Sequence, residues 1–209
     1  MIGSVAATFG PNGDPPLYSG FSAAKGFFGS LLGGAIRFFT GGDVNHAFFV
    51  FWSPDFNAWL TVGANANGVT VMTVPEFCKT REIEYLFAPS SSWSLWTGLR
   101  AHVGDLDRHY NYTGLFGMAH VEIVKKLTGR PGANLLDDRD DIFCSEWCAE
   151  VIRAALPGSK GNALAFMARY KADQIDPSSL RDSEKGSVWF APVPLGVVTR
   201  PPLTVKPAA

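Results

Sequence analysis

The sequence predicts a domain of the α+β class, in which helices pack on an antiparallel sheet. Runs of β-branched and aromatic residues follow one another between residues 46 and 87, and helices are expected near residues 93–107 and from Cys144 onward. Strands followed by helices are typical of this class. The 209 residues are 46% hydrophobic and 13% aromatic, a composition that argues against disorder and suffices for one buried core.

The expected elements follow in order along the chain. The run that begins at His46 is β-branched and aromatic and stops at Ser53-Pro54, as a buried strand does. Apolar residues recur at helical spacing after Cys144, so a helix is predicted to begin at or next to this cysteine. Further strands are expected near residues 59–62, 69–74 and 82–87, and further helices near residues 93–107 and 121–127.

Three regions are predicted along the chain, with the domain itself at residues 30–186. Residues 1–29 include a stretch rich in glycine and proline and are predicted to be an N-terminal extension. Residues 187–209 hold five prolines and are predicted to be an extended C-terminal tail. The apolar run 27–39 is interrupted by Arg37 and by glycines, so a helix packed on the domain is favoured over a membrane role.

Cys144 is the candidate nucleophile, and His46 is the candidate base. At a helix N-terminus, free backbone N–H groups and the positive end of the helix dipole favour a thiolate over a thiol. Such a cysteine attacks carbonyl carbons near neutral pH when a base takes its proton. Taken alone, Cys144 is better explained as a buried structural thiol and His46 as a strand cap, but together they favour a catalytic pair.

The order of the two residues narrows the class of enzyme. None of the four histidines follows Cys144, so the base must precede the nucleophile. This order excludes ordinary papain-like enzymes, in which the cysteine comes first. A circularly permuted papain-like core has the required order, with the histidine strand first and the cysteine helix last.

Other segments extend this pattern over residues 30 to 182. They are residues 30–47, Gly68-Val69, Tyr110-Asn111-Tyr112 with Gly114, Phe143-Cys144-Ser145-Glu146 and Ile175-Asp176-Pro177-Ser178-Ser179-Leu180. In this order they resemble the permuted NlpC-type cysteine amidohydrolases, a papain-like family that is similar to lecithin-retinol-acyltransferase-like proteins. The resemblance implies a circularly permuted papain-like fold, with Cys144 and His46 as catalytic residues and no cofactor.

One position departs from that family. Its members usually carry a third polar residue, Glu or His, on the strand after the histidine strand, where it orients the imidazole. The aligned position here is Gly63, and residues 59–69 hold no carboxylate or imidazole. Thr61 and Asn65 lie on the same face by strand alternation and are the candidate orienting residues. A neutral partner stabilises an imidazolium less than a carboxylate does, so turnover is expected to be slow or absent.

The resemblance implies a cysteine hydrolase that cleaves an amide bond, with peptidoglycan peptide as its substrate. Cys144 would attack, His46 would carry the proton, and the Cys144 backbone N–H with the Tyr112 hydroxyl would stabilise the oxyanion. Related domains degrade cell walls in bacteria and in phage tails, so a virion-associated enzyme is expected, made in the cytoplasm without a signal peptide. Two alternatives stay open: an acyltransferase on lipid substrates, and a catalytically weak structural or binding module of a large particle.

Composition and spacing also bear on other partners. The net charge of −1 gives no electrostatic reason to expect nucleic acid, and no membrane contact is expected. Cys144 and Cys148 are one helical turn apart and could bind zinc with His46, but no second cysteine pair supports this, so no metal is predicted. Glu146 is predicted to serve the helix dipole rather than chemistry.

Overall fold

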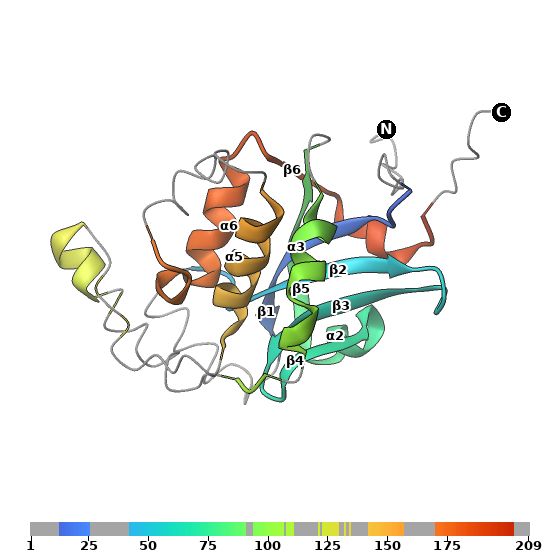
Figure 1. Ribbon diagram of the computed structural model, residues 1–209, viewed down its shortest axis with the longest axis horizontal. Helices are drawn as coiled ribbons and strands as arrows, with labels where there is room; N and C mark the ends of the chain where they lie inside the picture. The colour runs from blue at the N-terminus through green and yellow to red at the C-terminus, as the bar shows by residue number, and fades with distance from the viewer. Residues whose placement is uncertain are drawn as a thin grey trace.

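The computed structural model has a six-stranded antiparallel sheet with helices packed against it, so the predicted α+β class is confirmed (Figure 1). The strands lie in the order β4-β3-β2-β1-β5-β6. The structure describes residues 13–25, 42–90, 94–106, 108–110, 121, 123–129, 132, 134, 142–156 and 170–202. The apolar run 27–39 lies outside these residues.

The predicted starts of the histidine strand and of the cysteine helix are confirmed. The strands are β1 Leu17–Ala24, β2 His46–Ser53, β3 Ala58–Asn65, β4 Gly68–Thr73, β5 Arg81–Pro89 and β6 Phe190–Pro192. The helices are α2 Val74–Thr80, α3 Leu95–Ala101, α5 Cys144–Ala155 and α6 Pro177–Lys185, with 3-10 turns η1 Val103–Asp105, η3 Ala172–Gln174 and η4 Leu195–Thr199. Residues 121 and 123–128 are helical as predicted, whereas α3 is shorter than predicted because the chain tightens into η1.

The prediction that residues 1–29 form an extension is wrong for β1. This strand pairs with β2 on one side and with β5 on the other, and seven of its eight residues are buried. Its small residues hide the strand pattern in the sequence, yet they fit the space between two strands. At Gly20, an added Cβ would lie 2.6 Å from the Phe48 ring, so only glycine leaves room for that ring.

The prediction of an extended tail from residue 187 is wrong for the part that the structure describes. β6 pairs with the outer edge of β5, and Val197 and Val198 of η4 are buried against the sheet. The Trp59 indole N–H also donates to the Arg200 carbonyl oxygen at 2.6 Å. Prolines suit such an edge because an edge strand need not donate every N–H to a neighbour.

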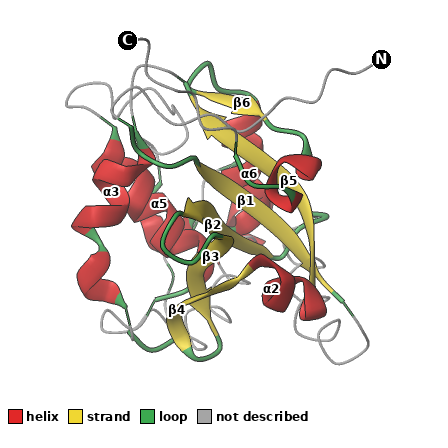
Figure 2. Ribbon diagram, turned by 90° about the vertical axis from the view of Figure 1, so that its right-hand side faces the viewer, coloured by secondary structure: helices red, strands yellow, loops and turns green. Residues whose placement is uncertain are grey.

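The two faces of the sheet carry different helices. On one face, α5 packs through Trp147 against Phe49, with ring centroids 5.6 Å apart. On the other face, α2 packs through Phe77 against Phe48, with ring centroids 4.5 Å apart. Figure 2 shows α3 and α5 on one side of the sheet and α2 on the other. Since side chains alternate along a strand, even-numbered residues of β2 face α2 and odd-numbered residues face α5.

Within the described part of the chain, no helix is long and apolar enough to cross a membrane.

Candidate thiol site

Cys144 is the first residue of α5, where it is 1% exposed. The chain is extended at Phe143, with φ −110° and ψ 168°, and becomes helical at the next residue. The Glu146 carboxylate accepts the Phe143 backbone N–H at 3.3 Å and so caps the first turn. The predicted helix-terminal role of Glu146 is therefore the one that the structure shows.

Several hydrogen-bond donors converge on the Cys144 sulfur. Burial raises the pKa of the thiol, and four groups offset part of that rise: the Ala47 backbone N–H, the positive charge of Arg81, the Ser145 backbone N–H and the Tyr110 hydroxyl. Each of them stabilises the thiolate more than the thiol. These four groups favour the thiolate, but burial outweighs them and favours the neutral thiol at rest.

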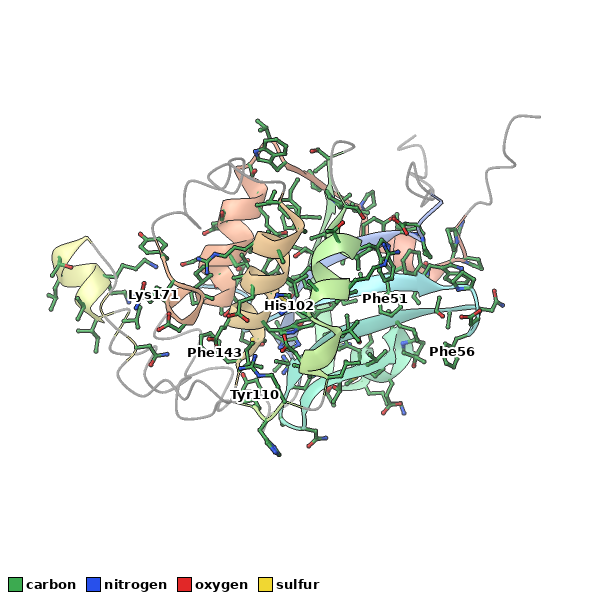
Figure 3. The ribbon with its side chains drawn as sticks, in the orientation of Figure 1. Phe51, Phe56, His102, Tyr110, Phe143 and Lys171 are labelled. Atoms are coloured by element: carbon green, nitrogen blue, oxygen red, sulfur yellow. The ribbon has the colours of Figure 1, made fainter. Side chains whose placement is uncertain are left out.

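The fold brings Tyr110 and Arg81 to the cysteine from distant segments. Tyr110 forms an isolated parallel bridge with Ile142, two residues before α5 begins, and Figure 3 shows Tyr110 near Phe143 at that end of the helix. Arg81 is the first residue of β5 and pairs with Ala24 at the end of β1. Burial lowers the pKa of its guanidinium, and the acidic groups of Cys144 and Tyr110 offset part of that change.

His46 begins β2 next to the cysteine, but its ring points elsewhere. The imidazole stacks on Phe48 at 5.9 Å and lies 5.9 Å from Phe77, on the face that α2 covers. Among the residues that the structure describes, no hydrogen bond joins it to Cys144, and its Nε2 has no partner. Burial, and secondly the charge of Arg81, hold the pKa of the imidazole well below its usual value, so the ring is neutral.

The proposed orienting residues are engaged elsewhere. The Thr61 hydroxyl donates to the Met72 carbonyl oxygen at 3.3 Å. The Asn65 amide donates to the Gly63 carbonyl oxygen and to the Thr70 hydroxyl, both at 3.0 Å. Neither side chain hydrogen-bonds to His46 in the described structure. The donor group of each is hydrogen-bonded within the β3–β4 hairpin instead. Tyr112, the predicted oxyanion donor, lies outside the described residues.

Ile175 and Asp176 connect the cysteine helix α5 to the start of α6. The Ser145 hydroxyl donates to the Ile175 carbonyl oxygen at 2.6 Å, and Asp176 caps α6 by accepting two backbone N–H groups. The Ser178 hydroxyl donates to the Val44 carbonyl oxygen at 3.3 Å. These bonds tie the start of α6 both to the cysteine helix and to the segment that leads into β2.

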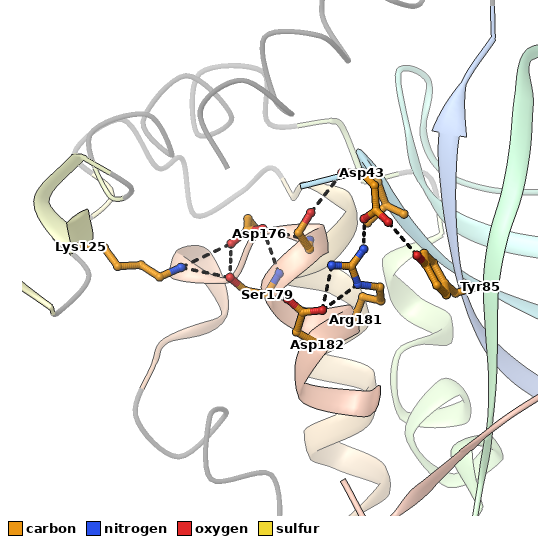
Figure 4. A network of polar contacts seen from close by, with 9 residues as sticks. Asp43, Tyr85, Lys125, Asp176, Ser179, Arg181 and Asp182 are labelled. Carbon is orange, nitrogen blue, oxygen red and sulfur yellow. Dashed lines mark hydrogen bonds and ion pairs between the residues drawn. The ribbon is translucent and has the colours of Figure 1, made fainter. Parts of the chain in front are cut away.

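A charged network reinforces the same junction (Figure 4). Arg181 of α6 forms ion pairs with Asp43, just before β2, and with Asp182. The Tyr85 hydroxyl of β5 donates to Asp43 at 2.7 Å, and the Arg181 guanidinium lies 5.1 Å from the Tyr85 ring centroid. The starts of β2 and α5 are therefore held in place by contacts outside the thiol site itself.

One group of side chains in the described structure has the composition of a metal site. His102, Asp105 and Glu150 offer ligand atoms within 4.8 Å of one another. Asp105 already accepts from His102 at 2.7 Å and pairs with Arg108 at 3.4 Å, so a cation there would compete with a guanidinium. The alternative zinc site of Cys144, Cys148 and His46 is not assembled among the described residues.

Sequence reasoning missed Arg81 and Asn45 and chose Tyr112 rather than Tyr110. Arg81 precedes alternating charged residues, which resemble a solvated strand, and nothing in its local sequence marks proximity to Cys144. Tyr110 belongs to the aromatic stretch that the resemblance singles out, so that stretch was the available signal.

Comparisons with protein-family models, with curated proteins and with solved structures found no match to this chain.

Proposed function

We propose that this protein is a thiol-dependent hydrolase that cleaves an amide bond, with Cys144 as its nucleophile. The observation that carries the proposal is the set of donors around the Cys144 sulfur: two backbone N–H groups, the Tyr110 hydroxyl and the nearby Arg81 charge. A structural core thiol needs none of these, because it packs as a small apolar side chain. A nucleophile needs them, because the thiolate is the reactive form.

The reaction follows from this arrangement. The Cys144 sulfur attacks the carbonyl carbon, its proton passes to His46, and the backbone N–H at the helix start stabilises the oxyanion. The amine leaves with the proton from His46, and a thioester remains. Water then attacks the thioester, which releases the carboxylic acid and restores the thiol.

His46 must turn for this proton transfer. Its ring lies with Phe48 and Phe77 on the α2 face, so a new side-chain rotamer alone would not bring it to Cys144, and the backbone at the start of β2 would also have to shift. Its Nε2, which has no partner in the described structure, is the ring nitrogen that would accept the proton.

A circularly permuted papain-like fold is part of the proposal. The histidine strand precedes the cysteine helix, and that helix packs on the antiparallel sheet beside the histidine strand, as such a core requires. With this fold, peptidoglycan peptide is the proposed substrate and a virion or another cell-wall-degrading assembly is the proposed setting. Fold alone does not determine activity, so this part depends on the resemblance.

A catalytically weak structural or binding module is the second candidate. The observation that favours it is burial: Cys144 is 1% exposed and His46 is 2% exposed, and the ring stacks among phenylalanines. Gly63 also supplies no carboxylate to stabilise an imidazolium.

Alkylation of the folded protein with iodoacetamide separates the two candidates. We expect Cys144 to be modified in the native state, with Cys78 as an internal reference because it is only partly buried. Cys144→Ser should abolish amide hydrolysis while the urea midpoint stays nearly unchanged. Modification of Cys78 alone in the folded protein, with Cys144 labelled only after unfolding, would establish the structural module instead.

A further inference from the structure

We propose that Arg81 and Asn45 form a binding site for a carboxylate that the substrate carries next to its scissile amide. The proposal rests on the proposed function, since the site adjoins the Cys144 thiol. It assigns a substrate class to that reaction: acyl compounds with a free carboxylate close to the bond that is cleaved.

Arg81 is a partly buried cation with no acidic partner among the described residues. Its Nη1 donates to the Asn45 side-chain oxygen at 3.3 Å, and no Asp or Glu of the described chain forms an ion pair with it. An unpaired charge in such a place is costly, and arginine in proteins is normally matched by a carboxylate or phosphate. The acidic side chains that act on it are Cys144 and Tyr110, and the pKa of the buried Cys144 thiol is raised, which favours its uncharged form.

Two further polar atoms beside Arg81 are also unsatisfied. Asn45 is 4% exposed, and its Nδ2 has no partner in the described structure while its Oδ1 is taken by Arg81. The buried His46 Nε2, whose titration Arg81 influences, has no partner either. Buried polar atoms in native proteins are almost always hydrogen-bonded, so the Asn45 Nδ2 is a donor that a ligand bound to Arg81 could use.

The chemistry of this cluster selects a carboxylate. A guanidinium and an amide N–H₂ are donors that match the two oxygens of a carboxylate, and charge-assisted bonds of this kind are the strong ones. The sheet order brings Arg81 and Asn45 together. Arg81 pairs with Ala24 along one edge of β1, and His46, which directly follows Asn45, pairs with Ser22 along the other edge. The Arg81 charge also acts on the Cys144 thiol and favours its thiolate, so a carboxylate bound to Arg81 would lie within electrostatic range of the attacking atom.

Two alkylating reagents that differ in charge test this site. In iodoacetate, the carbon that the thiolate attacks carries a carboxylate. In iodoacetamide, the same carbon carries a neutral amide. We expect the ratio of iodoacetate to iodoacetamide rate constants at Cys144 to be about tenfold higher in the folded protein than in the urea-unfolded chain. Arg81→Gln should return the ratio to the unfolded value, and Arg81→Lys should keep part of the gain.

Arg100→Gln is the matched control, because it removes the same charge from an exposed side chain that pairs with Asp14. It should leave the ratio unchanged. An equal ratio in folded and unfolded protein would refute the carboxylate site while leaving Cys144 as the nucleophile. A fall of the iodoacetate and iodoacetamide rate constants by the same factor in Arg81→Gln would also refute the carboxylate site. Arg81 would then act only by stabilising the Cys144 thiolate. Labelling by neither reagent would overturn the proposed function, and the carboxylate site with it.

Discussion

Glu184→Gln should stabilise the protein increasingly as the pH rises. Glu184 of α6 is 0% exposed, and its Oε1 accepts the Ser19 hydroxyl at 2.8 Å while its Oε2 has no partner in the described structure. Burial raises the pKa of this carboxyl well above its usual value, and the Ser19 bond offsets only part of the change. In the folded protein the group therefore stays protonated at pH values where the unfolded chain has released its proton.

The sign and size follow from proton linkage. The folded state binds more protons than the unfolded state above about pH 4.3, so the wild-type protein loses about 1.4 kcal/mol of stability per pH unit until the raised folded pKa is reached. Glutamine keeps the shape and the acceptor for Ser19 but cannot ionise. The free energy of unfolding of Glu184→Gln minus that of wild type should thus be smallest near pH 4 and should grow as the pH rises toward the raised folded-state pKa.

Urea denaturation of both proteins between pH 4 and pH 8 measures this difference directly. The values at pH 4 act as the internal control, because Glu184 is mostly protonated there in both the folded and the unfolded state. A difference that stays constant with pH would refute the reasoning, since it would mean that Glu184 titrates alike in both states.

Three further substitutions test the packing and the thiol site. Gly98→Ala should destabilise the protein by about 3 kcal/mol in urea, because the new Cβ would lie 1.9 Å from a carbonyl oxygen of α5. Tyr110→Phe should slow iodoacetamide labelling of Cys144 by roughly threefold to tenfold at neutral pH, because one donor to the thiolate is lost. Gly63→Glu should lower stability by about 1–3 kcal/mol without raising turnover, because a Cβ there would lie 3.1 Å from the Phe48 Cβ.

The elements with strong local patterns were predictable from the sequence. β2 is an aromatic run that stops at a proline, and α5 has apolar residues at helical spacing, so His46 and Cys144 fall at the predicted element starts. β1 was not predictable, because its serines and glycine carry little strand signal. Its place is determined by the strands on both sides, and those contacts are remote in sequence.

The composition of the thiol site was only partly predictable for the same reason. Arg81 reaches Cys144 only because β1 separates β2 from β5 and all three strands meet at one end of the sheet. The direction of the His46 ring was equally hidden. It follows from strand alternation together with the side of the sheet that α5 covers, and only the assembled fold defines that side.

The electrostatics of the site assign different tasks to its three titratable groups. Burial raises the pKa of the Cys144 thiol and lowers that of the His46 imidazole, so both effects oppose proton transfer from sulfur to ring. In the described structure no carboxylate hydrogen-bonds to the His46 ring to reverse this, and Gly63 has no side chain that could do so. Arg81 is the charged group that favours the thiolate, yet it also disfavours the imidazolium. A substrate carboxylate on Arg81 would weaken both effects, because it neutralises a guanidinium that acts on the ring and on the sulfur alike. Under the proposed function, substrate binding would therefore make the imidazole easier to protonate and the thiol harder to ionise, so Arg81 would position the substrate rather than drive the proton transfer.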